Sequence, residues 1–533
     1  MPMQIDFQIA IDLLVIAAYF CAVVFVGLVF GQKENSLESF ALGGRSIPWW
    51  AVLASIIAAE TSAATFLGTP GEGYKLVNYT YLQLVLGMII GRIIVAFVFL
   101  RPFYERNVYS IYEYLQFRFG SGTRKAASAI FLVTRILASG ARLYVAAIVL
   151  AVAFTLITGV QPSASQQFLI YLVSIVLITL ITALYTAIGG IKAVIWTDCI
   201  QSSVMIGGAI GAIFVLLSQI PHAAVDKLLH SGKLSMITVG TDAGASLLTN
   251  LGKILSADYT IWAALIGMTF TTLATHGTDQ DMVQRMLTAP DYKKSRISLV
   301  LSGLADLPIG FIFLTIGILL NLYYQAHADA GLPTKTNEVF AYFILKQMPI
   351  GLRGLLIAGI FATAMGSLSA ALNALATSYT RDFVQARAGH TEHTEDEVAV
   401  DDVRKFTYVF AGLVIMVAVA TAYFVIAHPD SRIIPIVLGI FGYTYGSMLG
   451  IFLLGLLTKG RGTDTGNLIG MLVGFLVVAI YSGLASGTAE ALRLKGVVAL
   501  LAPVPVIGFP WRIMLGSLVT MACAAAFRSE FKE

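Results

Sequence analysis

The sequence predicts an all-α membrane protein, and its composition and its apolar periodicity both support this fold class. Of the 533 residues, 57% are hydrophobic and only 12% are charged. Soluble domains have roughly 45–50% apolar and about 25% charged residues. Apolar runs of about 20 residues, the length that a helix needs to cross the hydrocarbon core, recur along the chain. The first residues are not basic, so we expect no cleaved signal peptide.

Thirteen apolar runs, bounded by glycine, proline or charged residues, are candidate transmembrane helices. They lie near residues 9–31, 48–69, 78–100, 127–157, 167–188, 192–219, 258–278, 298–324, 352–378, 406–427, 433–457, 465–486 and 509–527. An odd number of crossings places the chain ends on opposite sides, so Lys and Arg decide the orientation. Most of the 34 basic residues fall in the inner connections if the N-terminus is outside. We therefore expect an outer N-terminus and an inner C-terminus.

The predicted spans follow one another along the whole chain, so residues 1–533 are expected to form a single transmembrane domain. One inner connection, residues 381–405, is a polar and acidic loop that we place in the cytoplasm. The three cysteines are isolated, which argues against a disulfide framework or a zinc site. No basic tract interleaved with aromatic residues is present, so the expected partners are the lipid bilayer and small molecules rather than nucleic acid.

The second predicted span carries a polar centre, in which Glu60 stands among Thr61, Ser62 and Thr65. A carboxylate is costly in hydrocarbon, so we expect it to face the protein interior or water. Small neighbours such as Ala58 let a helix open and turn its carbonyl groups toward an ion. The sequence therefore predicts a solute and cation site inside the bundle.

Residues 185–201, YTAIGGIKAVIWTDCIQ, resemble the signature of the sodium:solute symporter family. Further segments are similar to the start of the family's first core helix, to the end of its sixth and to later helices, at residues 43–50, 277–285, 372–377 and 452–456. Together the resemblance covers about residues 8–460. It implies a LeuT-type core of two inverted five-helix repeats, with residues 48–278 holding the first repeat and the start of the second. The first helix of each repeat would be broken, around Glu60 and between residues 269 and 275.

The resemblance also implies a sodium site. It would use the carbonyl groups of Ala58 and Thr61 on the broken helix, and the carbonyl of Thr363 and hydroxyl of Ser367 on a facing helix. Sodium is a hard cation that prefers oxygen ligands. The family usually has two adjacent hydroxyl residues there, whereas this chain has Gly366 before the serine. One ligand is therefore missing. The alternative is that these small residues only permit close helix packing.

A possible second sodium site involves Asp198 and Ser369. Some relatives complete such a site with consecutive serines, but in this chain Ser369 is followed by Ala370. A salt bridge from Asp198 to an inner arginine is an equally good interpretation.

For the solute, the resemblance places a set of polar residues around a cavity: Glu60, Ser62, Thr65, Gln83, Thr272, Thr275 and Asp306. Sugar-transporting relatives have amides and a lysine at several of these places, so Glu60 and Asp306 argue against a copied glucose site. Arg135 and Arg142 lie on one face of a helix, and a guanidinium pairs well with a carboxylate. An arginine would then bind the carboxylate of an anionic solute, while Glu60 or Asp306 accepts hydrogen bonds from its hydroxyl or amine groups. Alternatively, these charged residues, with Arg92 in a neighbouring span, pair with one another.

The resemblance implies a sodium-coupled symporter that imports a sugar, sugar acid, small carboxylate or amino acid by alternating access, in a bacterial inner membrane. Two alternatives stay open. A proton could replace sodium, carried by Glu60, Asp198 or His276, or the fold could serve as a solute sensor. No nucleophile–base pair, metal-ligand cluster or phosphate loop in the sequence suggests an enzyme.

Overall fold

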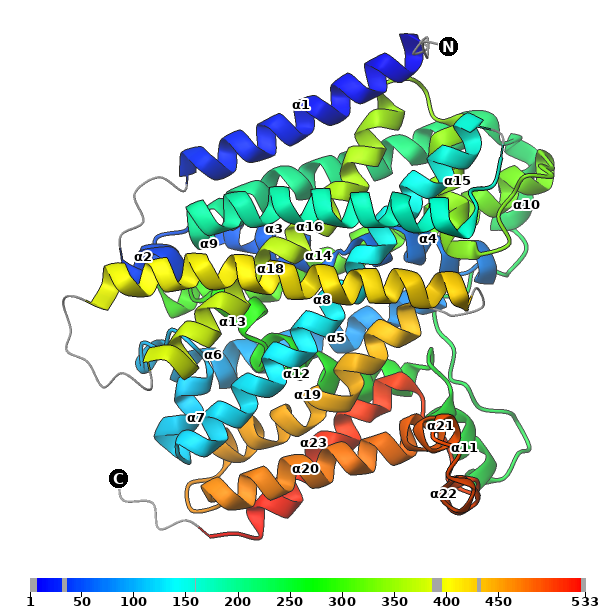
Figure 1. Ribbon diagram of the computed structural model, residues 1–533. Helices are drawn as coiled ribbons and strands as arrows, with labels where there is room; N and C mark the ends of the chain where they lie inside the picture. Colours follow the sequence, from blue (N-terminus) through cyan, green and yellow to red (C-terminus); the bar gives the residue numbers. More distant parts are fainter. Residues whose placement is uncertain (1–6, 31–35, 159, 386–394, 429–432, 529–533) are drawn as a thin grey trace.

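Long helices that run back and forth between two ends of a bundle form most of the computed structural model (Figure 1). It describes residues 7–30, 36–158, 160–385, 395–428 and 433–528. The segments that match the predicted spans are α1 (Phe7–Phe30), α3 (Trp49–Glu60) with α4 (Ala63–Leu76), α5 (Leu84–Ile94) with η3 (Val95–Phe99) and α6 (Leu100–Glu105), α8 (Ser121–Thr158), the two halves of α9 (Ala164–Gln219), η4 (Ala263–Met268) with α12 (Thr269–Gly277), α14 (Tyr292–Ala326), α16 (Leu352–Tyr379), α18 (Glu395–Ala427), α19 (Ile433–Leu457), α20 (Asp464–Tyr481) and α23 (Phe509–Ala525).

Short helices gather at the two ends of the bundle (Figure 1). One end holds α2 (Leu37–Leu42), α7 (Tyr112–Arg118) and α13 (Gln280–Met286), and the other holds α10 (His222–Leu229), α11 (Leu247–Ser256), α15 (Thr336–Gln347), α21 (Leu484–Ala491) and α22 (Lys495–Leu501). The remaining short helices are η1 (Gly43–Arg45), η2 (Thr80–Gln83) and η5 (Thr380–Gln385). Helix α1 begins at the second end, and α23 ends at the first. In the predicted orientation, the end with α7 and α13 faces the cytoplasm.

Within the described ranges, nine helices are long and apolar enough to cross a membrane, or ten if the bent pair Leu37–Arg45 and Trp49–Glu60 counts as one span. Helix α9 counts once there, although it contains two predicted spans. Gly190 separates its halves with φ 53°, and a Cβ at this position would lie 2.5 Å from the Phe40 carbonyl oxygen. Only glycine fits such a bend without strain. The total of thirteen crossings and the orientation stay predictions.

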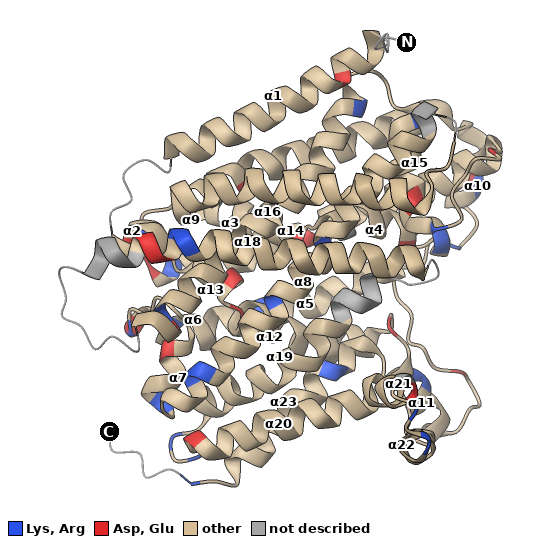
Figure 2. Ribbon diagram, in the orientation of Figure 1, with Lys and Arg blue, Asp and Glu red and all other residues tan. Residues whose placement is uncertain are grey.

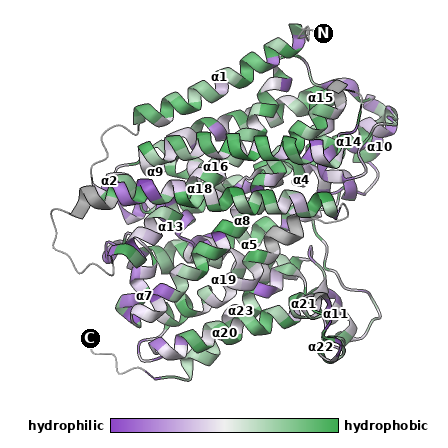
Figure 3. Cartoon of the chain, in the orientation of Figure 1, coloured by the Kyte–Doolittle hydropathy of each residue, from purple (hydrophilic) through white to green (hydrophobic). Residues whose placement is uncertain are grey.

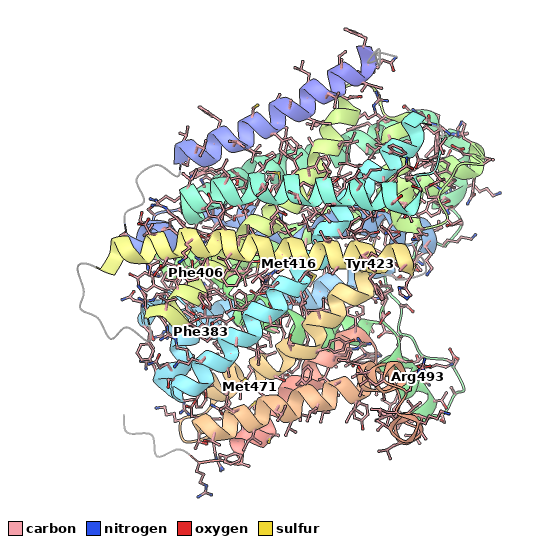
Figure 4. The ribbon with its side chains drawn as sticks, in the orientation of Figure 1. Phe383, Phe406, Met416, Tyr423, Met471 and Arg493 are labelled. Atoms are coloured by element: carbon pink, nitrogen blue, oxygen red, sulfur yellow. The ribbon has the colours of Figure 1, made fainter. Side chains whose placement is uncertain are left out.

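The outward faces of the bundle are apolar, as a lipid-facing surface must be. Figure 3 shows hydrophobic residues along most of the helices, and Figure 2 shows charged residues mainly at the helix ends, with few inside. On α18, the side chains of Met416 and Tyr423 are largely exposed (Figure 4). Apolar surface of this extent is unfavourable in water and favourable against lipid.

The predicted break around Glu60 is confirmed, because α3 ends at this residue and α4 begins at Ala63. The second break was expected between residues 269 and 275, and this position is wrong. Helix α12 continues to Gly277, and the break lies at Thr278 and Asp279, before α13. The hydroxyls of Thr271 and Thr275 donate to carbonyls four residues earlier. They are therefore accommodated within the helix rather than ending it.

Candidate solute and cation site

The first helix break releases the two carbonyl groups that the sodium site would need. In an unbroken helix the Ser62 N–H would donate to Ala58, but here it donates to the Glu60 carbonyl at 3.0 Å. The Thr65 N–H likewise donates to the Ser62 carbonyl at 2.9 Å instead of to Thr61. The Ser62 hydroxyl caps α4 by accepting from the same Thr65 N–H. The carbonyls of Ala58 and Thr61 have thus lost their usual helical donors and are available to a cation.

Helix α16 packs against both α3 and α4 and carries the remaining predicted ligands. The Ser367 hydroxyl lies 3.1 Å from the Thr363 carbonyl oxygen. Ser367, Ala63 and Arg142 line one enclosed cavity of about 10 Å³ next to the break. The site would combine neutral carbonyl and hydroxyl oxygens, which suit a hard monovalent cation. The assignment of these ligands stays a prediction that this arrangement supports.

Gly366, which stands where relatives have a hydroxyl, packs against polar side chains of α9. A Cβ at this position would lie 2.5 Å from Gln201 Oε1 and 3.2 Å from Asp198 Oδ1. The Ser369 hydroxyl donates to the Gly366 carbonyl at 3.1 Å. The Gln201 amide therefore occupies the space that a side chain at position 366 would need.

Asp198 is engaged as an ion-pair partner. Its Oδ2 accepts from the Ser55 hydroxyl at 2.6 Å and pairs with the Arg285 guanidinium. Its Oδ1 has no hydrogen-bond partner within the described segments. This geometry fits the salt-bridge interpretation of Asp198, and the second sodium site with Ser369 remains a prediction.

Arg135 and Arg285 belong to one continuous series of ion pairs across α8, α13 and α9, which we call the ion-pair chain (Arg135, Asp279, Asp281, Arg285 and Asp198). Arg135 pairs with Asp279, and its Nη1 lies 3.0 Å from Asp281 Oδ2. Arg285 Nε lies 3.6 Å from Asp281 Oδ1. All five side chains are buried. Arg135 was a candidate for gripping the solute, but the structure places it in the alternative role, paired with two carboxylates.

Arg142, two helical turns further along α8, has a different environment. Its guanidinium lies 4.9 Å from the centre of the Phe441 ring. It makes no ion pair and no hydrogen bond with any residue that the structure describes. It also lines the cavity that contains Ser367. An arginine of this kind is free to bind an anion from outside the protein.

Four other ionisable side chains meet at the first helix break and form what we call the Glu60 quartet (Glu60, Arg92, His276 and Asp306). Arg92 pairs with Glu60, and its Nη2 lies 2.7 Å from Asp306 Oδ2. His276 Nε2 lies 2.7 Å from Glu60 Oε1. The carboxylate side chains keep 15% of their surface accessible, whereas those of Arg92 and His276 keep 0% and 4%. The side chains of Arg92 and His276 therefore lie behind the carboxylates, which border an accessible space.

The other predicted solute residues have local roles in the structure. Gln83 donates through Nε2 to the Tyr259 carbonyl at 3.1 Å and accepts at Oε1 from the Thr238 N–H at 3.2 Å. Both ends of its amide therefore bind the outer connection. Thr272 packs against α5, because a Cβ added to Gly91 of that helix would lie 2.6 Å from the Cβ of Thr272. Thr275 lies 3.0 Å from His276 Nδ1 and so adjoins the quartet.

Arg92 and His276 complete the quartet, although the sequence analysis named Arg92 only as a pairing partner and His276 only as a possible proton carrier. The signal for both was an ionisable residue within an apolar span. A buried carboxylate at the inner end, Asp382, accepts from the hydroxyls of Ser110 and Ser128 at 2.8 and 2.7 Å and from Arg124 Nε at 2.7 Å. This cluster fixes η5 to α8 and to the segment before α7.

The two broken helices, the carbonyls released at the first break and the ionisable groups around them define a secondary transporter of the LeuT class. The chain belongs to the sodium:solute symporter family, whose family model matches residues 40–474. It is 28% identical to the sodium/sialic acid symporter SiaT of Proteus mirabilis over 473 residues, 88% of each chain. It is also 28% identical to the human sodium-coupled monocarboxylate transporter 2, over 90% of this chain and 74% of that protein.

Solved structures confirm the fold class. A Na⁺-coupled sialic acid symporter in a substrate-bound outward-open state superposes with a TM-score of 0.77 at 23% identity, over 98% of this chain and 99% of the other. Mhp1, a nucleobase-cation-symport-1 family transporter, superposes with a TM-score of 0.51 at 13% identity, over 93% and 94%. The chain is a sodium-coupled symporter of a small organic solute, with sodium as its coupling ion. It is an integral membrane protein.

Proposed function

We propose that the solute carries a carboxylate and that Arg142 binds this group. One observation carries the proposal: within the described segments, Arg142 has no ionic partner, although it lies inside the bundle beside Ser367. Arg92 and Arg135 are both engaged by carboxylates. A solute carboxylate would pair with the Arg142 guanidinium through two parallel hydrogen bonds. The relatives named above, symporters of sialic acid and of monocarboxylates, carry solutes with this group.

Sodium and solute would bind next to each other. The carbonyls of Ala58 and Thr61 belong to the broken helix, whereas the Thr363 carbonyl and the Ser367 hydroxyl belong to α16. A sodium ion held by both elements would fix α16 against the break, and the cavity wall that contains Arg142 would be fixed with it. Sodium would thereby prepare the solute site, which is the linkage that symport requires.

We also propose that the solute crosses unchanged, without any catalytic step. Residues 1–533 would act as one transport unit, with the acidic segment 381–405 on the cytoplasmic side. The structure corrects the expected loop, because residues 381–385 lie in η5 and residues 395–405 form the start of α18. Residues 386–394 of this loop lie outside the described segments.

Uptake of radiolabelled small carboxylates into proteoliposomes tests the proposal. We expect an inward sodium gradient, but not a choline gradient, to drive uptake. Arg142→Gln should lower uptake by at least about tenfold, the loss expected for one charge-assisted interaction, while Arg142→Lys should retain part of it. Arg101→Gln, which breaks an exposed pair with Glu105, is the matched control. Normal uptake by Arg142→Gln, or uptake without sodium, would contradict the proposal.

A further inference from the structure

The Glu60 quartet is a second charged feature of the site, and it indicates which chemical group the other end of the solute carries. We propose that Glu60 and Asp306 bind an ammonium group, so that the solute is a zwitterion with its carboxylate on Arg142 and its amine on the quartet. This inference rests on the proposed function, because it assumes that Arg142 holds the carboxylate. It adds the class of solute, a small amino acid, to the site.

The geometry of the quartet supports a ligand that donates hydrogen bonds. The two carboxylates are the groups that border accessible space, while Arg92 is completely buried behind them. Arg92 Nη2 contacts both carboxylates and holds them side by side. A group that enters this space therefore meets two neighbouring acceptors. An ammonium carries three donors and can bind both carboxylates at once.

The quartet places two carboxylates against a single guanidinium, that of Arg92. The imidazole of His276 contacts only one of them, with Nε2 2.7 Å from Glu60 Oε1. Within the described residues, Asp306 therefore shares its guanidinium with Glu60 and has no cation of its own. An uncompensated charge is costly inside a membrane protein. The ammonium of a solute supplies the missing positive charge, whereas a sugar hydroxyl does not.

The two proposed sites adjoin the same helix break. Glu60 is the last residue of α3 before the break, and Ala63, the first residue of α4 after it, lines the cavity that contains Arg142. A solute with its carboxylate on Arg142 and its amine on Glu60 would therefore extend across this break.

Matched pairs of carboxylates that differ only in an amino group test the inference. The probes are propionate against β-alanine and butyrate against 4-aminobutyrate, with gluconate as a hydroxyl-rich acid and propylamine as an amine without a carboxylate. Binding to the purified full-length protein is measured in sodium buffer by calorimetry and thermal shift. We expect the amino member of each pair to bind at least about tenfold more tightly. Glu60→Gln and Asp306→Asn should each remove most of this preference.

The outcomes separate this inference from the proposed function. Equal binding within each pair, or tighter binding of gluconate, would overturn the ammonium site, as would a preference that survives both variants. If Arg142→Gln still weakened all the carboxylates, the proposed function would stand. Conversely, tight propylamine binding that depends on Glu60, with no effect of Arg142→Gln, would support the ammonium site and refute the carboxylate anchor. No binding by any probe would contradict both. Glu105→Gln, on an exposed pair, controls for the loss of one carboxylate.

Discussion

The two helix breaks carry acidic residues of opposite character. Asp279 is the N-cap of α13, where its side chain accepts from the Asp281 N–H, and a carboxylate is favourable at a helix N-terminus. Glu60 is the last residue of α3, where the helix dipole opposes its charge. It is held there by Arg92 and His276, from two other helices. The break at Asp279 is therefore stabilised by its own helix N-terminus as well as by Arg135, whereas the break at Glu60 depends on side chains of two other helices.

The same contrast applies to the charges around each break. In the ion-pair chain, the carboxylates of Asp279, Asp281 and Asp198 keep no more than 2% of their side-chain surface. Glu60 and Asp306 keep 15%. A closed set of ion pairs fixes the relative positions of helices, and an open set can exchange partners with a ligand. The same residue types therefore stabilise the structure at one break and, we infer, bind the solute at the other.

The largest expected effect comes from breaking the closed set. Arg285→Ala would leave Asp198 and Asp281 buried without this guanidinium. We expect the variant to lose about 3–5 kcal/mol of stability, as is typical when one partner of a buried pair is removed. Thermal unfolding of the detergent-purified protein measures the loss. Arg101→Ala, in an exposed pair, should unfold like the unmodified protein. Equal unfolding temperatures for the two variants would show that the ion-pair chain contributes nothing.

The second expected effect concerns the end of the ion-pair chain at Asp198. Gly366→Ser restores the hydroxyl that relatives have, but its Cβ would meet Gln201 Oε1. We expect a loss of about 1–3 kcal/mol from overpacking. Gln201→Ala should recover much of this loss in the double variant, because it removes the obstructing amide. Unfolding temperatures of both single variants and of the double variant give the coupling. Additive effects would refute the steric explanation.

The sequence predicted the helices well because each apolar run is long and clearly bounded, and because Gly190 marks the turn inside α9. It located the break at Glu60 from the polar residues in an apolar span. It misplaced the break at Asp279, because threonines that bond back to their own helix look the same in sequence as threonines that open it. Pairing across helices was beyond reach: whether Arg135 or Arg142 is free depends on the position of Asp279, far away in sequence.

A third test addresses the cavity that Ala63, Arg142 and Ser367 line. Ser367→Ala removes the one side-chain hydroxyl that the predicted sodium site takes from α16. We expect the sodium concentration for half-maximal uptake to rise by about tenfold, equivalent to about 1.4 kcal/mol, with little change in unfolding temperature. Ser203→Ala is the control, because this exposed hydroxyl bonds only within its own helix. An unchanged sodium dependence would move the cation site away from Ser367.

The smallest expected effect on solute binding concerns Gln83. Family resemblance places Gln83 beside the solute, but in the structure its amide binds the Tyr259 carbonyl and the Thr238 N–H. Gln83→Leu should therefore loosen the outer connection, at a cost of about 1 kcal/mol for each lost hydrogen bond. Hydrogen exchange at the Thr238 amide should become severalfold faster, while solute affinity stays within about twofold. Gln167→Leu, whose amide bonds Tyr171 in the same helix, is the control. If solute affinity fell sharply while exchange at Thr238 did not change, Gln83 would belong to the solute site, and the accessible space in front of Glu60 and Asp306 would extend to α5.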